Sequence, residues 1–212
     1  MRFFRDIEVG PGRDLSGLGE GMRRGLDRAV LRGLTLLPEV NQTNFGTKLV
    51  NGWKYPPMDY GRAGVNGAWL TRASLQSLGG IVANDPEEAV YIVAHADSGG
   101  QLLNGKSHYR IHFAKDQIPP VKAFWSMSLY DNTNNLVDNS LNRYSLGDRS
   151  PGLAFNPDGS LTLYVGHELP EGAAKSNWLP APADEFYLVL RAYLPGKPIV
   201  DQIWEPPAVV RQ

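Results

Sequence analysis

The spacing of hydrophobic residues divides the chain into a helical first part and a strand-forming second part. Over residues 15–38, apolar side chains recur at intervals of three and four, the period of an amphipathic helix. Pro38 is expected to end that helix, because proline has no amide hydrogen and its ring clashes with the preceding turn. A weaker stripe of the same period predicts a second helix over residues 63–79, and residues 1–14 are expected to form an arm.

From residue 88 onwards the period falls to two, which is typical of strands with one buried face. The alternation predicts strands over residues 89–96, 107–113, 122–130, 161–167 and 186–193, separated by turns rich in glycine and proline. We therefore expect a mainly β protein, an antiparallel jelly-roll-like β-sandwich with an N-terminal helical segment. The expected division is an arm and amphipathic helix over residues 1–45 and a β-sandwich domain over residues 46–212.

The composition indicates a folded domain and excludes some kinds of chemistry and of binding partner. The 212 residues are 42% hydrophobic and 20% charged, which is enough apolar material to bury a core. Cysteine is absent, so disulfides and thiol nucleophiles are excluded. The formal net charge of −1 leaves no basic surplus, so we expect no nucleic-acid partner.

The sequence also carries expectations about location. No segment is long and apolar enough to span a membrane, and the opening residues Met1–Asp6 become charged at once, unlike a signal peptide. The expected location is cytoplasmic as written, or periplasmic or secreted if an upstream signal has been removed.

A series of short motifs gives the second part of the chain a family resemblance. They are, in order, Phe124–Asp131 (FWSMSLYD), Asn142–Arg149 (NRYSLGDR), Asn156–Leu161 (NPDGSL), Asn177–Pro182 (NWLPAP) and Trp204–Pro207 (WEPP). Through these motifs the chain resembles the bacterial domain of unknown function 1214. The resemblance implies a jelly-roll β-sandwich and no agreed activity. Many relatives carry a preceding domain of unknown function, numbered 1254, and a secretion signal, so this chain is expected to be a short, single-module form.

Histidines are the first candidates for chemistry. On a helix, His108 and His112 would share a face and could ligate one metal ion, but in a strand they stand about 13 Å apart. We therefore predict no metal and no cofactor, and His108, Arg110 and His112 form either one wall of a polar groove or a solvent-facing strand side. His95 and Asp97 are placed to pair, although Asp97 is equally typical of a turn.

Charged residues within the family-like motifs have two interpretations. Arg143 and Arg149 could clamp a carboxylate, sulfate or phosphate, since guanidinium groups bind such anions through two parallel hydrogen bonds. They could equally pair with Asp131 and Asp148 and hold a long loop in place.

Aromatic residues offer surface for a sugar ring or another flat ligand. Tyr130, Tyr144 and Trp178 are the candidates, and Trp178 lies in a loop-like segment before a proline. Trp125 is in the middle of a predicted strand and is expected in the core.

Three functions follow from these residues. The first is a binding module that holds a small polar, anionic or carbohydrate-like ligand in a groove, with Arg110, Arg143 and Trp178 in contact. The second is a hydrolase or lyase in which His108 or His112 acts as general acid or base and Arg143 holds an anionic substrate. The third is an assembly subunit that docks a protein partner or a second copy through the helix at residues 15–38.

Overall fold

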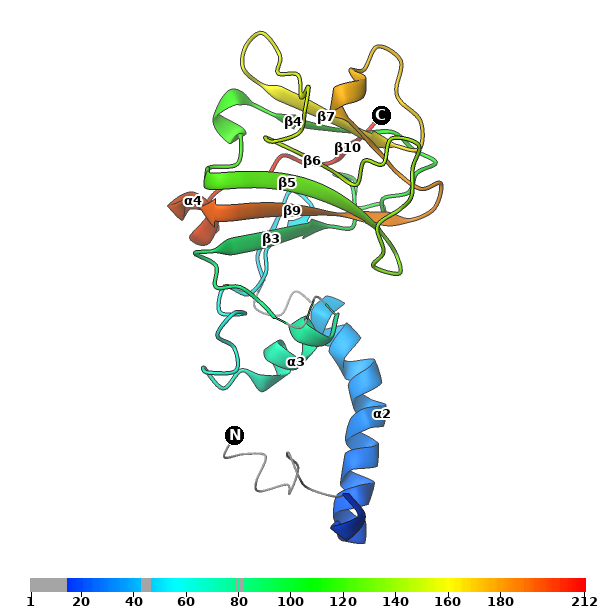
Figure 1. Cartoon of the computed structure of the whole chain (residues 1–212), viewed down its shortest axis with the longest axis vertical. Coiled ribbons are helices and arrows are strands. Elements are labelled where there is room, and N and C mark those ends of the chain that lie inside the picture. The colour runs from blue at the N-terminus through cyan, green and yellow to red at the C-terminus, as the bar shows by residue number, and fades with distance from the viewer. Residues whose placement is uncertain (1–14, 43–46, 79, 81) are drawn as a thin grey trace.

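The protein is mainly β and folds as two packed sheets with a helical extension (Figure 1). The computed structural model describes residues 15–42, 47–78, 80 and 82–212, so the predicted arm at residues 1–14 lies outside the described residues. The expected mainly β fold with an N-terminal helical segment is confirmed.

Ten strands form the two sheets. The larger sheet contains, in spatial order, β1 (Leu49–Val50), β2 (Trp53–Lys54), β3 (Ala89–Ala94), β9 (Phe186–Pro195), β5 (Val121–Asp131) and β6 (Ser145–Gly147). The smaller sheet contains β10 (Val210–Arg211), β4 (Tyr109–Phe113), β7 (Leu161–Gly166) and β8 (Trp178–Pro180). Short helical turns η2 (Lys115–Gln117), η3 (Lys175–Asn177) and α4 (Lys197–Val200) lie in the connections.

All five predicted strands are present, as β3, β4, β5, β7 and β9. The other five span only two or three residues each, too few for alternation to reveal them. The pairs are antiparallel with one exception, because β8 runs parallel to β7. The sandwich is therefore antiparallel, as expected, except at that edge.

The core lies between the two sheets. The larger sheet contributes buried residues such as Ile92, Met127 and Leu190, and the smaller sheet contributes Ile111, Leu163 and Leu179. Trp125 is in the core as predicted, with 1% of its surface exposed, and its ring packs 5.6 Å from that of Phe113. Alternate residues of the long strands therefore point inward, and the residues between them form the two outer faces.

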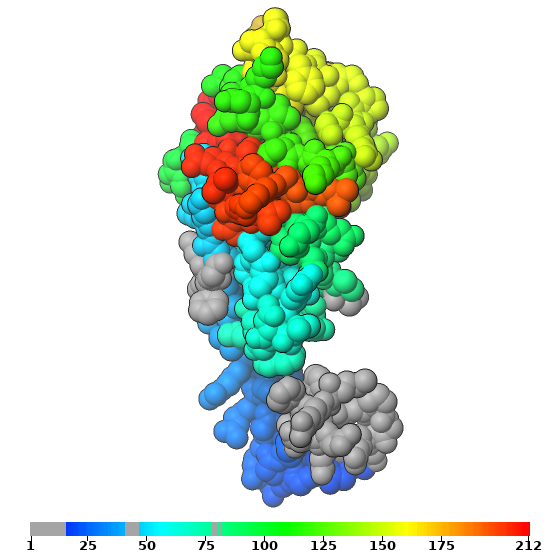
Figure 2. Space-filling view, turned by 90° about the vertical axis from the view of Figure 1, so that its left-hand side faces the viewer, coloured from blue at the N-terminus to red at the C-terminus, as the bar shows by residue number. Residues whose placement is uncertain are grey.

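The helices extend away from the sandwich rather than covering it (Figures 1 and 2). After a helical turn η1 (Leu15–Gly17), α2 (Glu20–Gln42) runs outward and packs on α3 (Trp69–Leu78), where the Ser74 hydroxyl donates to the carbonyl oxygen of Leu37 at 2.8 Å. No helix in the described part of the chain is both long and apolar enough to cross a membrane.

The predicted helix boundaries are partly wrong. Pro38 lies inside α2 instead of ending it. Proline removes only one backbone hydrogen bond there, and the contact of the neighbouring Leu37 with α3 supports the continued helix. The second helix begins at Trp69, six residues later than predicted, because Gly67 adopts a φ of 78°, which is outside the helical region.

Candidate functional site

The polar face predicted on one strand exists on the outer surface of the smaller sheet. In β4, Tyr109 and Phe113 are buried, whereas Arg110 and His112 are exposed. His108, just before this strand, is half-buried. The alternation predicted for this segment is confirmed.

The register of the smaller sheet places Arg110 beside two aromatic residues. Arg110 pairs with Tyr164 of β7, and Tyr164 pairs with Trp178 of β8. Because paired residues share a face of a sheet, the three side chains stand next to one another on the outer surface. We call these three residues the Arg110 row. Arg110 is exposed, and both rings are half-buried.

Trp178 is held in place by its neighbours. Its indole Nε1–H donates to the carbonyl oxygen of Gly166 at 3.0 Å, and Arg143 donates to its backbone carbonyl at 2.8 Å. The preceding Asn177 is 4% exposed and bonds the backbone of Ala154 and Thr162 through its side-chain amide. The ring and the backbone of Trp178 are therefore each held by a hydrogen bond.

Histidines lie on either side of Arg110 along the β4 segment. His112 Nδ1 lies 3.0 Å from the Thr162 hydroxyl. On the other side, His108 packs against Gly166, where a Cβ would lie 2.9 Å from its Nδ1, so glycine makes room for the imidazole. That Nδ1 is buried and has no hydrogen-bond partner in the described part of the chain.

The outer face of the smaller sheet carries charged groups of both signs. Within the described residues, Arg110 forms no ion pair with a carboxylate. Near His112, hydrogen bonds from the Ser160 hydroxyl and amide, with a smaller contribution from the imidazole, lower the pKa of Asp158. The face therefore has an unpaired cation at the row and a carboxylate beside His112.

A shared metal does not suit this arrangement. His108 and His112 are four residues apart along extended backbone, which separates them by about 13 Å. Among the described residues, no group of three or more His, Asp or Glu side chains is placed to hold a metal ion. The surface instead presents one guanidinium group, two aromatic rings and two imidazoles.

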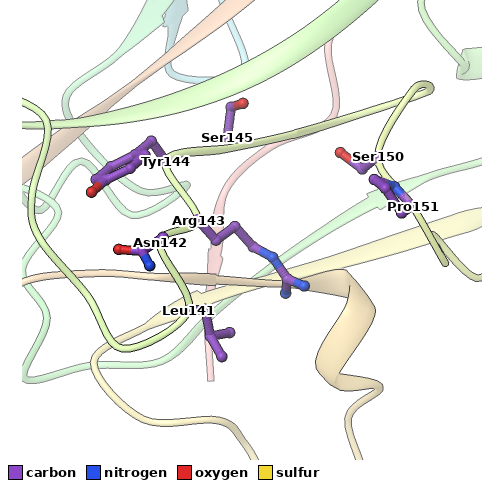
Figure 3. Close-up of a pocket in the computed structure, with 7 residues that line it drawn as sticks. All are labelled: Leu141, Asn142, Arg143, Tyr144, Ser145, Ser150 and Pro151. Atoms are coloured by element: carbon purple, nitrogen blue, oxygen red, sulfur yellow. The ribbon is translucent and has the colours of Figure 1, made fainter.

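Arg143 and Tyr144 lie at a separate, open pocket of ≈ 290 Å³ (Figure 3). Its lining comes from Leu141, Asn142, Arg143, Tyr144, Ser145, Ser150 and Pro151. The Arg143 guanidinium donates to the carbonyl oxygens of Lys175 and Trp178, and the Tyr144 hydroxyl donates to Asp138 Oδ1 at 3.3 Å. Arg143 therefore holds the backbone of Trp178, one member of the Arg110 row.

The proposed pairing of arginines with aspartates is wrong for all four residues. Arg149 donates to the Ala123 carbonyl oxygen and lies 4.2 Å from the Phe124 ring centre. Asp148 accepts from the Trp125 amide at 3.0 Å. Asp131 accepts from the Thr133 amide and hydroxyl and the Asn135 amide, and these bonds lower its pKa. The loops are thus held by bonds to backbone groups and within turns, which charge spacing in a sequence does not show.

Of the two interpretations of His95 and Asp97, the structure shows the turn and not the pair. The His95 ring lies 4.9 Å from the Tyr187 ring, and burial, with the charge of Lys54, lowers its pKa. Asp97 accepts from the amides of its own turn and from Arg211 instead.

Tyr130 belongs to a second surface, on the outer face of the larger sheet. It stacks on Tyr187 at 5.5 Å and contacts Arg191. Neither Tyr187 nor Arg191 is among the site residues predicted from the sequence. The signal was present in the strand at residues 186–193, where these polar and aromatic side chains alternate with the buried leucines.

Together the two packed sheets, the helical extension and the polar and aromatic outer faces define a β-sandwich protein. The chain belongs to the DUF1214 family, described as protein of unknown function, whose pattern matches residues 88–197. That match covers the strands from β3 to β9 and confirms the resemblance seen in the sequence.

Two solved structures are similar to this chain. One is the VPA0106 protein from Vibrio parahaemolyticus, with 25% identity over 99% of this chain and 49% of that chain, and a TM-score of 0.65. The other is an uncharacterised protein from Burkholderia cenocepacia, with 15% identity over 100% of this chain and 47% of that chain, and a TM-score of 0.45. The chain thus spans about half the length of each. No curated protein matches it.

Proposed function

We propose that the protein is a binding module that holds a small, anionic, carbohydrate-like ligand on the Arg110 row. The observation that carries this proposal is the register that sets Arg110, Tyr164 and Trp178 side by side across three strands. A guanidinium without a carboxylate partner favours an anion, and adjacent rings favour the apolar face of a sugar.

The hydrogen bonds that hold Trp178 in place favour a role for its ring in ligand binding. A ring that is already fixed loses little conformational entropy when a ligand stacks on it. The bonds to Gly166 and Arg143 hold the indole and its backbone, while Arg110 remains free of an ion pair within the described residues. An acidic sugar combines the ring and the charge that such a surface would recognise.

Titration calorimetry with D-galacturonate tests the proposal, with D-galactose as the neutral comparison. We expect galacturonate to bind at least about tenfold more tightly, because one charge-assisted hydrogen-bond pair is worth about 1.5–3 kcal/mol. Arg110→Ala is expected to remove that difference, and Trp178→Phe to weaken both sugars.

Arg28→Ala is the matched control, since Arg28 is an exposed arginine on α2, outside both sheets. It should bind like the unaltered protein. Equal binding of the two sugars, no binding of either, or unchanged galacturonate binding by Arg110→Ala would each contradict the proposal.

A second candidate function is self-assembly through α2. Leu18, at the start of the predicted apolar stripe, is buried, but Val30 and Leu34 are 64% and 72% exposed, and the adjacent Leu31 is 67% exposed. Apolar side chains grouped in this way on a projecting helix are typical of an interaction surface.

Self-assembly predicts a dimer whose mass falls to that of a monomer in the double variant Leu31→Ser/Leu34→Ser. Light scattering after size-exclusion chromatography measures this directly. Val65→Ser is the control, because Val65 is 87% exposed but lies outside α2. A monomeric unaltered protein at high micromolar concentration would rule out the second copy as the occupant of this helix.

A further inference from the structure

Two clusters of aromatic side chains lie on the outer face of the larger sheet, on neighbouring strands. In one, Tyr193 stacks on Phe124 at 4.3 Å and meets Tyr91 edge-on at 6.3 Å. In the other, Tyr130 stacks on Tyr187 at 5.5 Å. Arg191 of β9 lies between them, since it pairs with Tyr91 on one side and with Ser126 on the other. We call Tyr91, Phe124, Tyr130, Tyr187, Arg191 and Tyr193 the tyrosine face.

Arg191 is the charged centre of this face. Its guanidinium donates to the hydroxyl of Ser128 at 3.2 Å and to the Tyr130 hydroxyl, and it lies 5.6 Å from the Tyr130 ring centre. Ser128 is only 2% exposed, so one anchor of the guanidinium is buried. These contacts fix the fork of the guanidinium but supply no negative charge.

Among the residues that the structure describes, no acidic side chain pairs with Arg191. Asp131, at the end of β5, already accepts three hydrogen bonds from its own turn. Arg149 adds a second positive charge over Phe124. A half-buried cation without a carboxylate partner, on a face that carries a second cation, is complementary to an anion.

The hydrogen bonds made by the tyrosine hydroxyls indicate which kind of ligand body suits the tyrosine face. Tyr187 donates to Asn134, Tyr130 accepts from Arg191, and Tyr91 accepts from Asn84. Burial raises the pKa of Tyr187 to about 12 and also raises that of Tyr91, which reflects how far the two phenols are withdrawn from water. With their hydroxyls engaged, the rings offer mainly edges and apolar surface, which suits an aromatic body better than a polyhydroxylated one.

We propose that the tyrosine face is a binding site for an aromatic carboxylate, whose carboxylate pairs with the Arg191 guanidinium and whose ring packs among Phe124, Tyr130 and Tyr193. This site lies on the opposite sheet from the Arg110 row and is independent of the function proposed there. The planar guanidinium fork matches a carboxylate through two parallel hydrogen bonds.

Titration calorimetry with benzoate tests this site, with benzamide as the neutral probe of the same shape. We expect benzoate to bind at least about tenfold more tightly than benzamide. This comparison uses the unaltered protein, so it does not depend on whether a variant folds. Arg191→Gln should weaken benzoate to the level of benzamide, and Tyr130→Phe, which frees the guanidinium from one anchor, should weaken it by a smaller factor.

Arg28→Ala serves as the control, since that exposed arginine is on α2, outside both sheets, and should leave benzoate binding unchanged. Equal affinity for benzoate and benzamide, or full benzoate affinity in a folded Arg191→Gln variant, would overturn the proposal. Loss of benzoate binding in Arg110→Ala alone would assign the anion to the Arg110 row and also overturn it.

Discussion

Gly105→Ala is expected to lower the free energy of unfolding by about 3 kcal/mol or more, the upper range for forcing extra atoms into a packed site. A Cβ at this position would lie 1.6 Å from the carbonyl oxygen of Pro182 and 2.7 Å from its carbon. The obstacle is backbone, so no side-chain rotation relieves it. The Gly105 amide also donates to the Asp184 carbonyl oxygen at 3.0 Å, which draws the two segments together.

Thermal or urea unfolding measures this effect, and the loss corresponds to a Tm lower by about 6 °C or more for a chain of this length. Gly25→Ala is the matched control, because a Cβ there meets nothing within 4 Å and alanine favours a helix. Its stability should be equal or higher. A Gly105→Ala variant as stable as Gly25→Ala would mean that the two backbones are not in contact in solution.

Asp97→Ala is expected to cost about 2–3 kcal/mol of stability, because it removes the acceptor of several hydrogen bonds in a buried place. Asp97 is 4% exposed and accepts from the Gly99 and Gln101 amides at 2.9 and 3.0 Å. Its other oxygen accepts from Arg211 at 2.8 Å and ties the C-terminal strand β10 to the turn.

The hydrogen bonds within the turn and the ion pair with Arg211 can be measured separately. After Arg211→Ala the buried Asp97 carboxylate keeps the two hydrogen bonds from the Gly99 and Gln101 amides, so the loss should be smaller than for Asp97→Ala, about 1–2 kcal/mol. Urea unfolding of both single variants and the double variant measures the coupling. If Arg211→Ala costs as much as Asp97→Ala, the ion pair rather than the turn dominates, contrary to this interpretation.

Much of the fold was predictable because long strands leave a clear period. The segment at residues 107–113 showed both its buried residues and its polar side, and the structure has both. The short strands β6 and β8 gave no such signal, and their places depend on long-range pairing. The continuation of α2 past Pro38 likewise depends on its contact with α3, which the local sequence does not contain.

The candidate sites were predictable in their residue types but not in their grouping. Arg110 and Trp178 are 68 positions apart in the sequence and meet only because β7 lies between their strands. Arg143 was expected to bind a ligand, but its guanidinium donates to two carbonyl oxygens of the segment at residues 175–178. Arg191 was visible only as one polar position in a strand, and its significance comes from the rings that neighbouring strands supply.

The most direct measurement of the Arg110 row is a nuclear magnetic resonance titration of the tryptophan indole N–H signals with D-galacturonate, assigned by single Trp→Phe variants. We predict that the Trp178 signal shifts with saturation, while the signal of Trp125, which is 1% exposed between the sheets, stays in place. The Trp178 shift should disappear in Arg110→Ala. A saturating shift confined to other tryptophans, or no shift of Trp178 at millimolar galacturonate, would contradict the proposed binding surface.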